Sequence, residues 1–278
     1  MRRALKSSLS RFVKSRLLAE AVIAGILMGA ITFLFLGVFE LAINMFRRPR
    51  YMDNSYLTMC LTRLPLFFTV FQAVLSSQFT GRDIGMRTIN NRISTGFSRS
   101  SIFLADLLVM IISSLLSEAL CAATIFALVK TVPVKSGARL DPKITGLLIM
   151  LGLISIAFAS LFTLFQYFLS NRLLTLIICV LMLPALIFFT GNIDSALEEP
   201  YKYEFTDDVT GITETRYNEL YLTGKKREIY IYLSEASPYN MYGAISSREI
   251  SRGDTVALIT FALSSGLGLL AISKKEFP

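Results

Sequence analysis

Histidine is absent from this sequence of 278 residues, and cysteine occurs only three times. Without histidine, the chain can form neither a His-based zinc site nor a Ser-His-Asp triad. Cys60, Cys121 and Cys179 lie in or beside apolar runs and include no CxxC pair, which argues against a disulfide framework. We therefore expect no catalytic residue and no metal site.

Charged residues are also scarce, at 17% of the chain, whereas a soluble domain has about 25%. Hydrophobic residues make up 53%, and the mean hydropathy is +0.57. A helix that crosses a bilayer needs roughly 20 apolar residues, and several runs reach that length. We predict an all-α polytopic membrane protein with six transmembrane helices, over residues 17–43, 57–79, 102–129, 144–169, 173–190 and 255–272.

No GxxxxGK[ST] loop occurs, so the chain cannot bind ATP through a P-loop. No cofactor is expected on this chain, and an intramembrane enzyme is disfavoured because catalytic motifs are missing. The net charge of +8 would suit nucleic acid, but the cations flank apolar runs. That placement is typical of cytoplasmic loops that meet anionic lipid headgroups, so lipids and not nucleic acid are the expected partners.

Two polar stretches flank or interrupt the predicted spans. The first 16 residues carry six basic side chains, with apolar residues at helical spacing, and favour an amphipathic helix on the cytoplasmic membrane surface over a disordered tail. Residues 191–253 hold eight of the eleven tyrosines. There, 229–233 reads as a strand that a turn at 223–226 joins to 217–222, which predicts a small, partly β extracellular domain.

These features divide the chain into three parts and orient it. Residues 1–190 hold the first five spans, 191–253 the extracellular domain, and 254–278 the last span with a cytoplasmic C-terminus. With the N-terminus inside, the short inner segments carry 13 cations and the short outer loops carry seven. The excess of cations on the inner side predicts a multi-pass protein of the cytoplasmic membrane with both termini in the cytoplasm.

Arg63, Asp106 and Glu118 lie in apolar surroundings, where a charge needs a partner or water. Glu118 is nearest the middle of its span, and Asp106 lies close enough to the cytoplasmic edge to be simply hydrated. A pair between Arg63 and Glu118 that locks two helices together is favoured over a polar transport path. Pro184 is expected to kink the fifth span.

Residues 80–101 form the most informative polar segment. It is basic and amphipathic, contains three glycines, and leads directly into the third span. A short helix here would lie on the membrane face, open to a soluble partner. The alternative is an ordinary basic loop.

In this segment Asp83-x-Gly85-x4-Asn90, followed by Gly96-Phe97-Ser98-Arg99 and an isoleucine at 102, resembles permeases of the ABC transporter type-2 family. The resemblance covers about 25 residues as motif and the whole chain as architecture. A phrase at 237–240 is similar to one that precedes the last span in that family. The family often has Glu at the position of Asp83 and Lys at that of Asp106, which leaves the role of Asp106 open.

The resemblance implies a permease subunit of an ABC exporter, with ATP and Mg²⁺ bound by a separate cytosolic ATPase, expected in two copies. A second permease copy or a sister permease would complete the pathway. Residues 80–101 would be the coupling helix, with contacts from Asp83, Gly85, Met86, Arg87, Gly96, Phe97, Ser98 and Arg99. The second and fifth spans would line the pathway, with Arg63, Gln72, Ser76, Ser77, Glu118 and Pro184 as its candidate polar or bend residues.

The alternative function is a non-transporting membrane receptor or assembly subunit that acts through the extracellular domain. The substrate cannot be derived from the residues.

Overall fold

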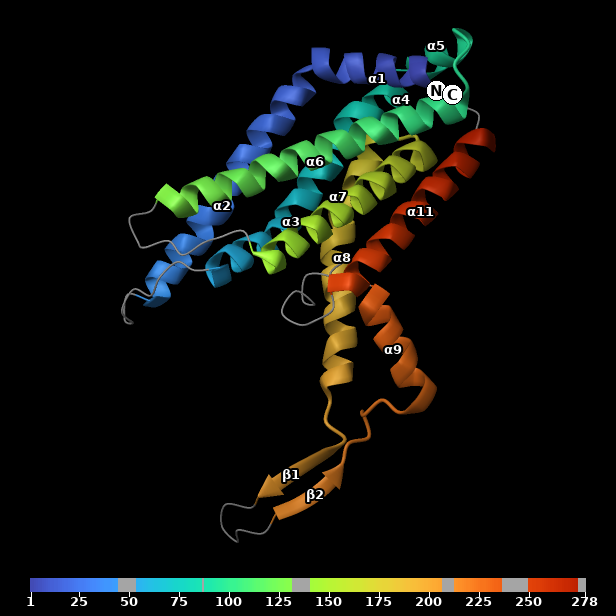
Figure 1. Ribbon diagram of the computed structural model, residues 1–278. Helices are drawn as coiled ribbons and strands as arrows, with labels where there is room; N and C mark the ends of the chain where they lie inside the picture. The colour runs from blue at the N-terminus through green and yellow to red at the C-terminus, as the bar shows by residue number, and fades with distance from the viewer. Residues whose placement is uncertain (45–53, 87, 132–140, 207–212, 237–249, 275–278) are drawn as a thin grey trace.

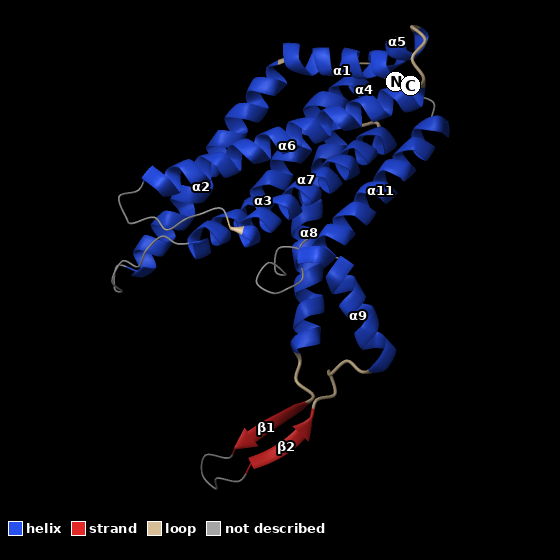
Figure 2. Ribbon diagram, viewed as in Figure 1, coloured by secondary structure: helices blue, strands red, loops and turns tan. Residues whose placement is uncertain are grey.

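The computed structural model (Figure 1) describes residues 1–44, 54–86, 88–131, 141–206, 213–236 and 250–274. Long helices dominate these residues, and the strands are confined to one small hairpin (Figure 2). Five of the helices are long and apolar enough to cross a membrane, which gives the chain the architecture of a multi-pass helical membrane protein. They are α2 (Arg16–Asn44), α6 (Arg99–Thr131), α7 (Pro142–Leu169), α8 (Arg172–Glu198) and α11 (Ile250–Lys274).

The predicted second span forms helix α3 (Asn54–Ser76), which continues into a π-helical turn, η1 (Ser77–Gly81). Among the described residues, α3 is not one of the five apolar helices. The side chain of Arg63 lies outside the described residues, and so does the predicted phrase at 237–240. A sixth span therefore stays a prediction.

Small residues allow α2 and α6 to pack closely. A Cβ atom at Gly25 would lie 2.6 Å from the carbonyl oxygen of Ser117, and one at Gly29 would lie 2.7 Å from that of Cys121. Glycines four residues apart place two backbones in contact along one helix face, which is a common way for helices to associate in lipid. The spacing therefore fixes one face of α6 against α2.

Helix α7 forms the centre of the bundle and packs against α3, α6, α8 and α11. Its buried side chains include Phe158 and Phe162, whose rings stack 5.6 Å apart. At the start of α7 the Asp141 side chain accepts a hydrogen bond from the backbone N–H of Ile144 at 2.8 Å. Pro142 occupies the first turn, where its missing N–H is harmless.

The link between α7 and α8 is as short as predicted. Ser170 adopts a left-handed conformation with φ of 53°, and Asn171 caps α8 by accepting a hydrogen bond from Leu174 N at 3.0 Å. Helix α8 continues without interruption past Pro184, whose side chain is exposed. It ends at Glu198, beyond the boundary predicted at residue 190.

The β structure predicted within residues 191–253 lies elsewhere than expected. Strands β1 (Lys202–Thr206) and β2 (Thr213–Tyr217) pair antiparallel, with Lys202 opposite Tyr217. The predicted strand at 229–233 is wrong, because these residues belong to helix α9 (Gly224–Ala236). Good helix formers surround the alternating Ile and Tyr residues, and a hydrogen bond of 2.8 Å from Ser234 to Asp194 ties α9 to α8.

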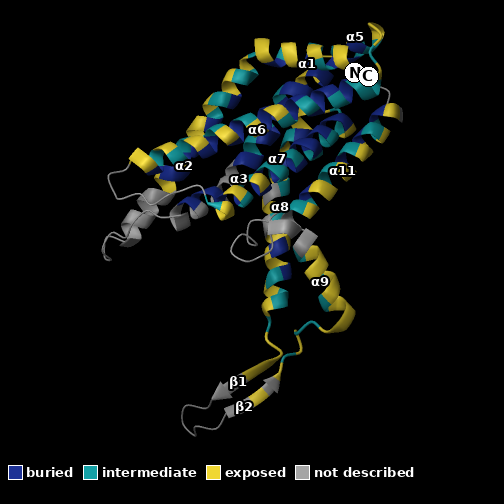
Figure 3. Ribbon diagram, viewed as in Figure 1, coloured by how far each residue is buried: buried dark blue, intermediate teal, exposed yellow. Residues whose placement is uncertain are grey.

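Helix α1 (Arg2–Lys14) lies across one end of the bundle, the end at which α11 also reaches its last described residue, Lys274 (Figure 1). We call this end of the bundle the terminal end. The β-hairpin lies at the opposite end. The first 16 residues thus contain a helix, and its place on a membrane surface stays a prediction. Phe12 and Ser8 are buried against the bundle, whereas Leu9 and Val13 are exposed. Figure 3 shows buried and exposed positions side by side along α1.

Candidate functional site

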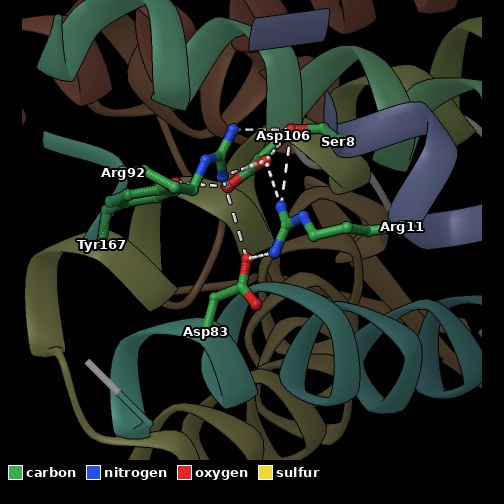
Figure 4. Close-up of polar contacts among 6 residues, drawn as sticks. All are labelled: Ser8, Arg11, Asp83, Arg92, Asp106 and Tyr167. Carbon is green, nitrogen blue, oxygen red and sulfur yellow. Dashed lines mark hydrogen bonds and ion pairs between the residues drawn. The ribbon is translucent and has the colours of Figure 1, made fainter. Parts of the chain in front are cut away.

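Five helices meet at the terminal end around a group of charged and polar side chains (Figure 4). They are α1, α4 (Arg82–Gly85), α5 (Thr88–Ser94), α6 and α7. Helices α4 and α5 belong to the segment 80–101. We call this group the ionic cluster; its members are Ser8, Arg11, Asp83, Arg92, Asp106 and Tyr167.

Asp106 on α6 is the centre of the ionic cluster and is fully buried. Its carboxylate accepts hydrogen bonds from Ser8 Oγ at 2.7 Å and from Tyr167 Oη at 2.6 Å. Arg92 Nη1 donates to both carboxylate oxygens, at 3.1 and 3.2 Å. A buried carboxylate needs such a set of donors because burial removes its water. The expectation that Asp106 is simply hydrated is therefore wrong.

The second acid of the ionic cluster, Asp83 on α4, forms an ion pair with Arg11 on α1. Arg11 Nη2 also lies 3.4 Å from Asp106 Oδ1, and Arg92 Nη1 lies 3.8 Å from Asp83 Oδ2. Two arginines and two aspartates thus alternate, and their formal charges cancel. The pairing connects α1 and the segment 80–101 to α6 in one network.

The pKa values of Asp83 and Arg11 show how strongly these two groups depend on each other. Burial raises the pKa of Asp83 above its usual value, although the hydrogen bond from Arg11 acts in the opposite direction. Burial also opposes the charge on Arg11, but its hydrogen bond with Asp83 and the charges of Asp83 and Asp106 together raise the pKa of Arg11. Removal of either partner would leave a partly buried group without its counter-charge.

Aromatic rings enclose the ionic cluster on two sides. The guanidinium of Arg11 lies 5.4 Å from the ring centre of Phe79, which meets Phe12 edge-to-face at 5.9 Å. On the other side the Tyr167 ring meets Phe103 edge-to-face at 5.3 Å. These rings limit access of water and hold the charged side chains in one arrangement.

The local sequence explains how α5 turns back into α6. Gly96 adopts φ of +91°, which a residue with a Cβ atom rarely does. Phe97 N donates to Arg92 O at 3.2 Å across this turn. Ser98 then caps α6 by accepting a hydrogen bond from Ser101 N at 3.3 Å. The Gly-Phe-Ser phrase that carries the family resemblance is therefore also a turn followed by a helix cap.

The residues predicted for coupling separate into two groups. Asp83 faces inward, whereas Gly85, Gly96, Ser98 and Met86 are exposed, and the Met86 side chain is 63% exposed. Phe97 and Arg99 are partly buried, and Arg87 lies outside the described residues. The segment thus has an anchored face and an outward face.

The residues predicted for the pathway do not form one group. The carboxyl group of Glu118 interacts with the hydroxyl of Ser155 on α7. Ser77 donates to Arg172 O at 3.4 Å, and Pro184 lies exposed on α8. Within the part of the chain that the structure describes, no interaction joins Glu118 to another of these residues, and a pair with Arg63 stays a prediction.

Gln72 and Ser76 belong to a buried polar strip that continues to Thr80 at four-residue spacing. The polar side-chain atoms of these three residues, all fully buried, have no hydrogen-bond partner among the described residues. The amide of Gln166 on α7 is likewise unpartnered, and its Oε1 lies 2.7 Å from where a Cβ atom on Gly81 would be. Unpaired polar groups in a buried position favour contact with water or a polar ligand.

Sequence reasoning missed most of the ionic cluster. It did not assign Ser8, Arg11, Arg92 or Tyr167 to any site, because they lie up to 98 residues from Asp106 along the chain. The available signal was the isolated acid at position 106 in an apolar run beside a segment rich in arginine. Comparison with models of known families and with curated proteins finds no match to this chain.

Proposed function

We propose that this chain is the permease subunit of an ABC exporter in the cytoplasmic membrane, driven by ATP hydrolysis on a separate cytosolic ATPase. The observation that carries the proposal is the ionic cluster, which joins the segment 80–101 to α1, α6 and α7 through hydrogen bonds of 2.6–3.2 Å and two ion pairs with Asp83. The resemblance of that segment to type-2 permeases supplies the identity of the partner.

The arrangement provides a mechanical link. The outward face of the segment, with Met86 at its turn, would contact the ATPase, and the inward face holds Asp83 and Arg92. Interdigitated buried charges have few alternative arrangements, so a displacement of α4 and α5 would move α6 with them. ATP binding would then shift the spans between inward- and outward-facing states because the ATPase binds the two states with different free energies.

The buried polar strip of Gln72, Ser76 and Thr80 supports a transport role for α3. A path for polar solutes needs hydrogen-bonding groups inside the bundle, and this strip supplies them next to the π-helical turn η1. Such turns occur frequently at functional sites. A second permease, identical or related, would complete the path on the other side.

Co-purification tests the proposal. The full-length chain, extracted from its native membrane in mild detergent, should retain a P-loop ATPase chain with measurable ATP hydrolysis. Met86→Glu should abolish this association, because a charge would enter the contact. The matched control is Leu220→Glu at the hairpin end, where the side chain is 72% exposed and the association should persist. No associated ATPase with the native chain, or equal retention by both variants, would contradict the proposal.

The receptor or assembly role remains the second candidate, and one feature favours it. Tyr217 and Leu220 are exposed at the hairpin end, at 66% and 72%. Tyrosine is enriched in recognition surfaces. Under this role, loss of the hairpin would abolish function while Met86→Glu would leave it intact.

A further inference from the structure

Glu118 is the ionisable group furthest from any aqueous end among the described residues of α6. At 1.5 Å per residue it lies about 28 Å from the start of that helix and about 20 Å from its end. Its side chain is buried, with 6% exposed. Charge at such a depth is expensive, so Glu118 needs either a positive partner or a bound proton.

Among the described residues, the surroundings of Glu118 provide hydroxyl groups but no cation. The hydroxyl of Ser155 on α7 interacts with the carboxyl group, and Oε2 has no hydrogen-bond partner among the described residues. Ser114, one helical turn away on the same face of α6, is fully buried and also unpartnered. Glu118 and Ser114 thus leave two buried oxygen atoms on one face of α6 without a hydrogen-bond partner among the described residues.

The titratable groups of the helices packed around Glu118 leave it isolated. On α6 the neighbour is Cys121, a neutral thiol. The described part of α2 that packs here, residues 21–35, carries no ionisable side chain, and on α7 Lys143 and Tyr167 lie near opposite helix ends. On α3 the side chain of Arg63 is outside the described residues.

The glycine contacts determine which way the carboxyl group faces. Gly25 and Gly29 hold the Ser117 and Cys121 face of α6 against α2. Glu118 follows Ser117 by about 100° around the helix, which turns it toward α7. Gly152 on α7 faces Leu115, with 3.6 Å between a Cβ atom on the glycine and Leu115 Cδ2, so the two helices also approach closely here.

We infer that Glu118, with Ser155 and Ser114, is a proton-binding site: the carboxyl group carries a proton while α6 and α7 are packed and exchanges it when they separate. A proton needs only one oxygen, whereas a metal cation such as Na⁺ needs several oxygen ligands. The described side chains at Glu118 offer one carboxyl group and two hydroxyl groups. The inference does not depend on the chain being an exporter subunit.

Infrared spectroscopy of the full-length protein in lipid bilayers tests this inference. A protonated carboxyl group buried between helices gives a carbonyl stretch distinct from the carboxylate bands. The native chain should show this band at neutral pH and lose it as the pH rises, and Glu118→Gln should lack it. Should that variant fail to fold, Ser155→Ala supplies the assignment, because loss of the hydroxyl partner shifts the frequency of the same band.

Two results would overturn the inference. The first is an identical carboxyl region in the native chain, Glu118→Gln and Ser155→Ala at every pH, as expected if Glu118 is permanently ionised by a pair with Arg63. The second is loss of the band at neutral pH on addition of Na⁺ but not of a bulky organic cation, which would make this a metal site.

Discussion

At the scale of single residues, Asp106 holds the terminal end together. It makes hydrogen bonds with partners from α1, α5 and α7, and each of those partners is buried or partly buried. A buried ion pair is not in itself a large source of stability, since dehydration offsets most of the attraction. The loss of one member is costly, however, because the remaining charge stays buried without compensation.

Asp106→Asn should therefore destabilise the protein by about 3–5 kcal/mol, since Arg92 keeps its charge and loses the closer of its two counter-ions. Tyr167→Phe, which removes one hydrogen bond to the same carboxylate, should cost less, about 1.5–3 kcal/mol. The free energy of unfolding in detergent micelles, measured for both variants, tests the order. An unchanged stability of Asp106→Asn would show that the ionic cluster is not formed.

The position of Asp106 in an apolar run is visible in the sequence, but its partners are not. A lone acid near the end of a span is compatible with hydration, and only the packing of α1 over α6 excludes water there. Arg11 and Arg92 look like ordinary cytoplasmic cations for the same reason. Long-range pairing of this kind depends on tertiary structure and has no local signal.

At the scale of helices, local chemistry was more informative. Pro142 after Asp141 and the Ser170-Asn171 turn both mark helix ends that the structure confirms. The strand predicted at 229–233 failed because alternation of Ile and Tyr over five residues fits either a strand or a helix face. The surrounding helix formers and the contact with α8 decide in favour of α9.

Cysteine labelling along α9 distinguishes the two structures. Positions 227, 230 and 234 are less exposed than their neighbours, which gives a repeat of three to four residues. Cysteines at these positions should react more slowly with a polar maleimide than cysteines at 228, 229 and 232. An alternation of fast and slow positions every second residue would instead establish a strand.

Close packing of α2 on α6 is testable in the same way. Gly29→Ala places a methyl group 2.7 Å from a backbone oxygen and should destabilise the bundle by about 1–3 kcal/mol. Gly266→Ala on α11 is the matched control, because nothing lies within 4 Å of its added Cβ atom. In thermal unfolding in lipid nanodiscs, Gly29→Ala should have a lower midpoint temperature than Gly266→Ala. Equal midpoints would argue against the α2–α6 contact.

At the scale of the whole molecule, the N-terminus and the last described residues of α11 lie at the end that carries the ionic cluster, and the hairpin lies at the other. Composition alone predicted a polytopic helical membrane protein, because long apolar runs have few other uses. It could not predict which helices pack together, since lipid-facing and buried side chains are equally apolar in such a bundle.

The arrangement predicts which side of the membrane the two termini and the hairpin end face. Tags at the N- and C-termini should both be accessible only from the cytoplasm, whereas a cysteine at Leu220 should react with an impermeant reagent added outside intact cells. These results follow if the chain crosses the membrane an even number of times. Termini on opposite sides would contradict both the orientation and the sixth span.

In the proposed function, the segment 80–101 transmits a partner's ATP cycle to the spans through the ionic cluster. The most direct measurement uses the purified complex with its ATPase, a cysteine at Ser76 and the three native cysteines replaced by serine. ATP should change the rate at which a small maleimide modifies position 76. Adding Asp106→Asn should leave ATP binding intact but abolish that change, whereas an ATP response equal to that of the parent would contradict the account.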